Sequence, residues 1–298
     1  MWLGLLGVAI FALTLPMTRL ATGTVDHPQL SPWFITFARA ALAGGLSVAF
    51  LALTRSPRPT RSQLKPLAWA TLGNCLGFPV LLGFALRHVP SGHAAVFTAL
   101  LPLTTAAMAA WVLHQRARLG FWLFAGLGAS LVVGFAVIRA TQHAQGFALE
   151  WADLALIGAI ISAAIGYVYG AQITPTLGAE RVICWVCVLA LPVTVPGTLL
   201  TWPDTPAPVS AWLALLYVGV FSMWAGFFAW YRGLAIGGAL KVSQVQLVQP
   251  FISILAAVPL LGEPLETMTL GFTLAVVATV FAGKRFAAGS PSPRAALT

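Results

Sequence analysis

The stretch from Tyr231 to Glu266, YRGLAIGGALKVSQVQLVQPFISILAAVPLLGEPLE, determines how the rest of the chain is interpreted. It is apolar and long enough to cross a bilayer, yet it carries glutamines at positions 244, 246 and 249, just before Pro250. Hydrocarbon offers no hydrogen-bond partners, so these amides are expected to face protein or a wet cavity. Pro250 has no N–H group, which leaves the carbonyl of Gln246 without its helical partner. The combination favours a pathway for a small polar solute.

A second copy of this pattern lies 148 residues earlier, where Pro102 corresponds to Pro250. The earlier copy runs from Leu86 to Arg118 and reads LRHVPSGHAAVFTALLPLTTAAMAAWVLHQRAR. Its proline frees the carbonyl of Thr98 in the same way. Because the offset is close to half of the 298 residues, the sequence indicates a duplicated chain.

The composition places the chain in a membrane. Hydrophobic residues make up 59% of it and charged residues 8%, and the mean hydropathy is +0.90. Soluble domains carry roughly a quarter charged residues. The net charge of +9 does not indicate nucleic-acid binding, because the basic residues lie in loops beside apolar segments. Cys184 and Cys187 form a CxxC inside an apolar segment, where we expect them to pack rather than react.

Ten segments have the length and apolarity of membrane spans, so we predict an all-α polytopic membrane protein of ten transmembrane helices. The first is expected to be retained, because no basic residue precedes it and no small-residue cleavage site follows. We expect a first five-helix repeat over 1–141, a second over 150–286 and a disordered cytoplasmic tail over 287–298. The segments are 1–21, 31–54, 66–86, 93–113, 120–138, 153–173, 181–200, 210–230, 239–260 and 268–286.

The distribution of Lys and Arg predicts the orientation. With the N-terminus in the cytoplasm, 12 basic residues fall in inner loops and the tail and 4 at or toward the outside. Both termini are therefore expected inside. Five helices per half is an odd number, so the two repeats must have opposite orientations. Inverted repeats are typical of alternating-access carriers, whose site lies near the midplane between the repeats.

Two motifs carry a resemblance to a known family. One is SPWFITFARAALAG at 31–44, with an arginine inside the second helix, and the other combines Leu234, Pro250 and Leu260–Glu263. With these motifs the chain resembles the EamA family of the drug/metabolite transporter superfamily. The resemblance implies ten helices in inverted repeats, a bacterial inner membrane, and export or facilitated passage of amino acids and related metabolites. Gln115 departs from the pattern, since the family usually has glutamate there.

Polar faces beside the two prolines supply the first candidate binding residues. Gln246, Gln249 and Ser253 share one face of a helix by their spacing. The corresponding positions in the fourth segment include Thr98 and Thr105, a milder polar face. Such side chains can also bond helix to helix. The matched prolines favour the cavity interpretation.

Four further residues have two interpretations each. Arg39 could meet a substrate carboxylate, or it could satisfy helix-end carbonyls near the outer surface. The resemblance implies the structural role for Arg39, which we hold slightly ahead. Asn74 could bind a ligand or join helices. Tyr167 and Trp224 could form an aromatic wall of the cavity, or they could simply pack.

Carboxylates are missing from the middle of the expected spans, and we find no acidic candidate there for ion coupling. His88 and His93 flank an outer turn, where they could be pH-sensitive, although we expect solvated turn residues. A facilitator, an exchanger or coupling through histidine therefore remain open. We predict a carrier, an exporter or facilitator of amino acids or related small polar metabolites. Its partners are this substrate, the lipid bilayer and, as an open option, a second copy in a homodimer. The alternatives are an intramembrane enzyme or a non-transporting membrane assembly subunit. We expect no catalytic residue, metal or cofactor, since no GxSxG or HExxH motif occurs.

Overall fold

A computed structural model describes residues 2–112, 118–142, 150–237 and 243–285. Within these ranges the chain is helical, and the one β-type contact is an isolated bridge between Gly23 and Pro28. The predicted tail, Gln115 and residues 238–242 lie outside the described residues. The helices of the first half are α1 (Trp2–Ala12), α2 (Thr14–Thr22), α3 (Pro32–Leu53), α4 (Arg61–Thr71), η1 (Leu72–Gly77), α5 (Phe78–His88), α6 (Ser91–Thr98), α7 (Leu101–Val112) and α8 (Leu119–Gln142). Those of the second half are α9 (Trp151–Leu177), α10 (Ala179–Leu200), α11 (Val209–Tyr217), η2 (Val218–Ala225), α12 (Gly226–Gly237), η3 (Ser243–Val248), α14 (Gln249–Leu261) and α15 (Thr267–Lys284).

Eight stretches of helix among the described residues are long and apolar enough to cross a membrane. Two shorter apolar helices, Gln246–Leu261 and Thr267–Gly283, follow them. The all-helical prediction is therefore confirmed for the described residues, which contain eight candidate spans. The ninth predicted span, 239–260, begins among residues that are not described.

Both prolines of the repeated pattern lie where regular α-helix is interrupted. Helix α6 ends at Thr98, and α7 begins at Leu101 with Pro102 as its second residue. On the other side, the 3-10 helix η3 ends at Val248, and α14 begins at Gln249, followed by Pro250. A proline is tolerated in the first turn of a helix, where its missing N–H breaks no bond. The two breaks predicted from the sequence are thus present.

Two π-helical segments, η1 and η2, interrupt two other spans. In η1 the chain passes close to α9: a Cβ atom on Gly73 would meet the backbone carbonyl of Ser162, and one on Gly166 would meet the amide of Asn74. The π segment lets Asn74 project at this crossing. Such segments are frequent at functional sites, because they re-aim side chains within a helix.

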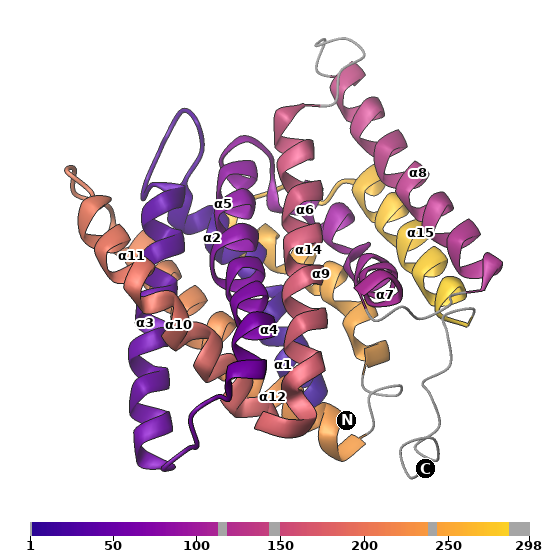
Figure 1. Ribbon diagram of the computed structural model, residues 1–298. Coiled ribbons are helices and arrows are strands. Elements are labelled where there is room, and N and C mark those ends of the chain that lie inside the picture. The colour runs from indigo at the N-terminus through magenta and orange to yellow at the C-terminus, as the bar shows by residue number, and fades with distance from the viewer. Residues whose placement is uncertain (1, 113–117, 143–149, 238–242, 286–298) are drawn as a thin grey trace.

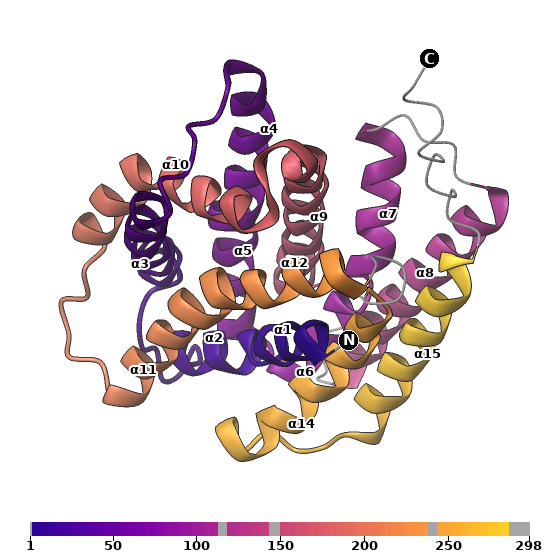
Figure 2. The same cartoon turned by 90° about the horizontal axis from the view of Figure 1, so that it is seen from below.

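The helices lie in neighbouring pairs (Figures 1 and 2). Helix α8 lies beside α15 at one edge, and α3 lies beside α10 toward the opposite edge. Between them α1 contacts α12, α4 and α5 contact α9, and α6 contacts α14. The end of the bundle where α2 and α5 end and α9 begins, at the top of Figure 1, is called the distal end below. The N-terminus lies at the other end.

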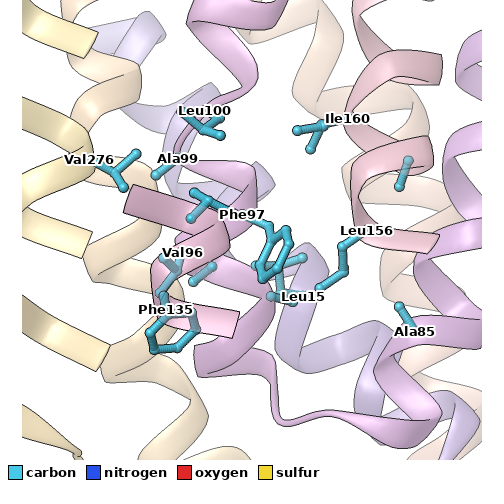
Figure 3. Packing of buried hydrophobic residues seen from close by; sticks show 14 of the residues in the cluster. Leu15, Ala85, Val96, Phe97, Ala99, Leu100, Phe135, Leu156, Ile160 and Val276 are labelled. Atoms are coloured by element: carbon cyan, nitrogen blue, oxygen red, sulfur yellow. The ribbon is translucent and has the colours of Figure 1, made fainter. Parts of the chain in front are cut away.

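The largest buried cluster surrounds α6 (Figure 3). Phe97 projects from α6 toward Leu15 and Leu156, and Phe135 lies beside Val96. All five side chains are almost fully buried. In contrast, many large apolar side chains on the periphery are exposed, as expected where lipid takes the place of water. The bundle therefore has a packed interior around α6 and an apolar outside.

Candidate functional site

A central cavity lies where the interrupted helices meet. Its wall includes residues of α2, α3, η1, α6, α9, η2 and α14. A second cavity adjoins it and shares the wall made by Thr98, Leu101 and Gln249. The polar residues of the central cavity are Thr14, Arg39, Asn74, Thr98, Tyr167, Ser222 and Gln249. Its apolar residues include Phe11, Leu15, Phe78, Met223 and Phe227.

Six of the nine residues singled out from the sequence line these two cavities. Thr98 and Gln249 lie in the wall that the two cavities share. Gln246 lines the adjoining cavity beside Pro102 and Pro250. The other three are Arg39, Asn74 and Tyr167, which line the central cavity.

Three of the predicted residues line neither cavity. Ser253 is buried, and its hydroxyl donates to the carbonyl of Ala12 at 2.6 Å. Trp224 packs against Phe228, with ring centroids 4.7 Å apart. Thr105 lies on α7, one turn beyond the shared wall. Ser253 lies one turn after Gln249 on α14, and Thr105 lies one turn after Leu101 on α7, so the cavities end within one turn of these two helices.

Arg39 does not lie near the outer surface, where the preferred interpretation of the sequence placed it. Its side chain is 3% exposed and lines the cavity instead of reaching the outer surface. The Nη2 atom donates to the hydroxyl of Ser222 at 3.3 Å, and that hydroxyl is 2.7 Å from the hydroxyl of Thr14. The Nε and Nη1 atoms are buried and have no hydrogen-bond partner among the described residues. A buried guanidinium with open donors is costly, which favours the presence of an anionic ligand group.

The charge of the cavity is positive. Arg39 is the one side chain with a full charge among the described lining residues, and no carboxylate is among them. The neutral groups offer both donors and acceptors, since amides and hydroxyls do both. Such a wall fits a small polar molecule with a negative group better than a cation.

The cavity is contracted in this structure. Its free volume is about 50 Å³, which holds a few water molecules at ~10–15 Å³ of probe volume each. Sites that enclose a metabolite are usually several hundred Å³. A molecule the size of a metabolite fits this cavity only if the surrounding helices move apart.

Sequence reasoning left Thr14 out of the site, and it gave no role to Ser222. The sequence did contain a signal for Ser222, because this residue corresponds to Asn74 under the 148-residue offset. In the structure both residues lie in π-helical segments. The sequence contained no such signal for Thr14, since a threonine side chain in an apolar helix more often forms a hydrogen bond to the backbone of its own helix. Its role follows from the approach of α2 to η2, which the sequence does not specify.

The structure also corrects the prediction for His93. Its side chain is buried, and its Nε2 atom lies 2.6 Å from Oδ1 of Asp153. His93 was expected to be a solvated turn residue, but α6 begins at Ser91 and places it on the first helical turn, facing α9. His88 remains at the edge, where its ring meets that of Trp151.

Comparison with known proteins assigns both halves of the chain to one protein family. The profile of the EamA-like transporter family matches residues 1–138 and again 150–282. The "uncharacterized transporter YdeK" of Bacillus subtilis is 40% identical over 286 residues, which cover 95% of this chain and 96% of that protein. The "uncharacterized inner membrane transporter YedA" of Escherichia coli K12 is 29% identical over 265 residues, or 85% and 82% of the two chains.

Two further similarities are more distant. A "probable terminal-alkyne amino-acid exporter" of Streptantibioticus cattleyicolor is 26% identical over 297 residues, covering 95% of this chain and 93% of that one. A solved crystal structure shares the fold, with a TM-score of 0.63 and 20% identity over 100% of this chain and 98% of the other.

Proposed function

The chain belongs to the EamA-like transporter family, and from this premise we propose that it carries amino acids or related small metabolites across a bacterial inner membrane. Transport proceeds by alternating access, with export or facilitated passage as its direction. The names of the relatives also indicate a transporter rather than an enzyme. The relative named as an amino-acid exporter supports the proposed class of substrate.

One observation carries the proposal: the buried guanidinium of Arg39 faces a cavity whose other polar groups are neutral. A substrate carboxylate can accept from Nε or from Nη1, and a bidentate contact pairs one of these donors with an N–H of Nη2. Asn74 and Gln249 then bind the ammonium or other polar groups with their amide oxygens. Apolar lining residues such as Phe11 and Phe227 accommodate a side chain. A zwitterionic amino acid satisfies all three regions.

Two inverted five-helix repeats, 1–141 and 150–286, form the proposed architecture. The helix pairs support it: the contact of α3 with α10 and that of α8 with α15 each join equivalent spans of the two halves. The contact of α1 with α12 corresponds to that of α9 with α5, and the contact of α2 with α11 corresponds to that of α9 with α4. The π segments η1 and η2 also occupy equivalent positions. With both termini in the cytoplasm, the distal end faces outward.

Exchange by purified protein in liposomes tests the proposal. Vesicles are loaded with an unlabelled compound, and uptake of its labelled form is followed with no net gradient. Leucine, threonine and glutamate serve as amino-acid probes, and putrescine serves as a diamine without a carboxylate. We expect exchange of at least one amino acid and none of putrescine. Exchange no faster than in protein-free liposomes for every amino acid, or equally fast exchange of putrescine, would contradict the proposal.

A further inference from the structure

A chain of hydrogen bonds joins three helices in the wall of the central cavity. Arg39 on α3 donates from Nη2 to the hydroxyl oxygen of Ser222 on η2 at 3.3 Å, and this oxygen lies 2.7 Å from that of Thr14 on α2. All three side chains line the cavity, and their exposed fractions are 3%, 4% and 6% in that order. The chain of bonds therefore connects the two halves of the protein beside the buried guanidinium.

The local structure before α2 explains why the hydroxyl of Thr14 faces Ser222. A threonine hydroxyl inside a helix usually donates to the carbonyl four residues earlier. That carbonyl belongs to Ile10 and accepts from the hydroxyl of Tyr217 at 3.0 Å. Thr14 is also the first residue of α2, which a single residue separates from α1. Its hydroxyl therefore bonds across the cavity wall instead of along its own helix.

The two hydroxyls hold one more hydrogen than their contacts use. Each carries one hydrogen, and the bond between them takes up one of the two, whichever oxygen is the donor. Apart from Arg39, which donates to Ser222, neither hydroxyl has another partner among the described residues. One O–H donor of the pair is thus left for a bound molecule.

The guanidinium of Arg39 adds N–H donors beside these hydroxyls. One N–H of Nη2 is taken by Ser222, and Nε and Nη1 are buried with no partner among the described residues. Because Nη2 and the Ser222 oxygen are 3.3 Å apart, one acceptor oxygen can lie within hydrogen-bond distance of both. No carboxylate is among the described lining residues of either cavity. A bound molecule has to supply the acceptors.

We infer that Ser222 binds the substrate's carboxylate together with Arg39, and that Thr14 positions Ser222 for this contact. Thr14 donates to Ser222, which leaves the hydrogen of Ser222 for the substrate. One carboxylate oxygen accepts from this hydroxyl and from the second N–H of Nη2, and the other accepts from Nε or Nη1.

The same donor set discriminates against a carboxamide. A carboxamide has one acceptor oxygen, and its nitrogen is a donor, so one of the donors of the site would face an N–H group. Ser222 therefore favours a carboxylate over the amide of the same molecule. The identity of the substrate rests on the proposed function, whereas the preference can be measured by binding alone.

Calorimetric titration of the purified protein tests the inference. The probes are leucine, threonine and glutamate, each compared with its own α-carboxamide, and the ratio of the two Kd values measures the carboxylate preference. We expect the parent to prefer the carboxylate for at least one probe. Ser222→Ala should lower this preference by about 10-fold or more, because a hydrogen bond to a charged group is lost. Thr14→Val, which removes a neutral hydrogen bond, should lower it by about 2-fold or more.

Thr18→Val is the matched control, one turn after Thr14 on α2. Its hydroxyl is buried, has no hydrogen-bond partner among the described residues and lines neither cavity. The control should keep the parent's preference. A merely structural role of Ser222 would weaken binding of acid and amide alike and leave their ratio unchanged.

Three results would overturn the inference: a parent without carboxylate preference, a Ser222→Ala variant that keeps the parent's preference, or an equal loss in Thr18→Val. If Ser222→Ala does not fold, Thr14→Val decides, and an unchanged preference in that variant would overturn the inference as well. A parent that shows the carboxylate preference but exchanges no amino acid in liposomes would contradict the transport proposal alone.

Discussion

At the scale of single residues, Arg39 is the side chain whose position demands an explanation. A buried guanidinium is costly unless acceptors surround it. The structure gives it one hydroxyl, from Ser222, and two of its nitrogens are buried with no hydrogen-bond partner among the described residues. A bound carboxylate would supply the missing acceptors.

The first prediction concerns Arg39→Gln. Hydrogen bonds to charged groups are worth about 1.5–3 kcal/mol, so affinity for an amino acid should fall by about 10- to 150-fold. Insertion should not suffer, because Gln costs less than Arg in a bilayer. Isothermal calorimetry, together with the amount of folded protein in the membrane, checks both points. Unchanged affinity in a well-folded variant would remove Arg39 from the site.

Ser253→Ala is the matched control at this scale. Its hydroxyl bonds the carbonyl of Ala12 and lines neither cavity. Loss of an inter-helix bond in a membrane protein costs roughly 0.6–1.7 kcal/mol. The variant should therefore unfold at lower temperature while its affinity stays that of the parent.

At the scale of elements, the helix breaks that follow from covalent structure were predicted correctly from the sequence. Proline removes a backbone donor in any surroundings, so the breaks at Pro102 and Pro250 could be predicted. The π segments could not, since they depend on how closely η1 approaches α9. The burial of His93 was missed for a similar reason. Its partner Asp153 is 60 residues away and becomes adjacent only through tertiary packing.

Gly166→Ala tests the role assigned to the η1 crossing. The added methyl group would collide with the amide of Asn74, which must then leave its place in the cavity wall. Loss of one neutral hydrogen bond, about 0.5–1.5 kcal/mol, should weaken substrate binding by about 2- to 12-fold. Overpacking should also lower stability by about 1–3 kcal/mol.

Gly158→Ala on the same helix is the control for this prediction. Its new methyl group would meet only the end of the Leu81 side chain, at 3.1 Å, and Leu81 does not line the cavities. Substrate affinity should stay near that of the parent. Equal loss of affinity in both variants would mean that the effect is general to α9 and does not act through Asn74.

At the scale of the whole molecule, the central cavity is built from both halves of the chain. Arg39, Asn74 and Thr98 come from the first half, and Tyr167, Ser222 and Gln249 come from the second. A rocking motion of one half against the other would therefore widen the cavity on one side and close it on the other. The contracted volume and the hydrogen bonds that Glu263 accepts from Ser91 and Gly92 at the distal end fit one stage of such a cycle.

Two-sided access to this cavity tests the central claim most directly. Leu101 lies in the wall shared by both cavities, so Leu101→Cys is labelled with an impermeant thiol reagent in right-side-out and in inverted vesicles. Alternating access predicts labelling from each side, and it predicts that an amino acid active in the exchange assay protects the thiol in both cases. Labelling from one side alone, or labelling that this amino acid leaves unchanged, would contradict the account.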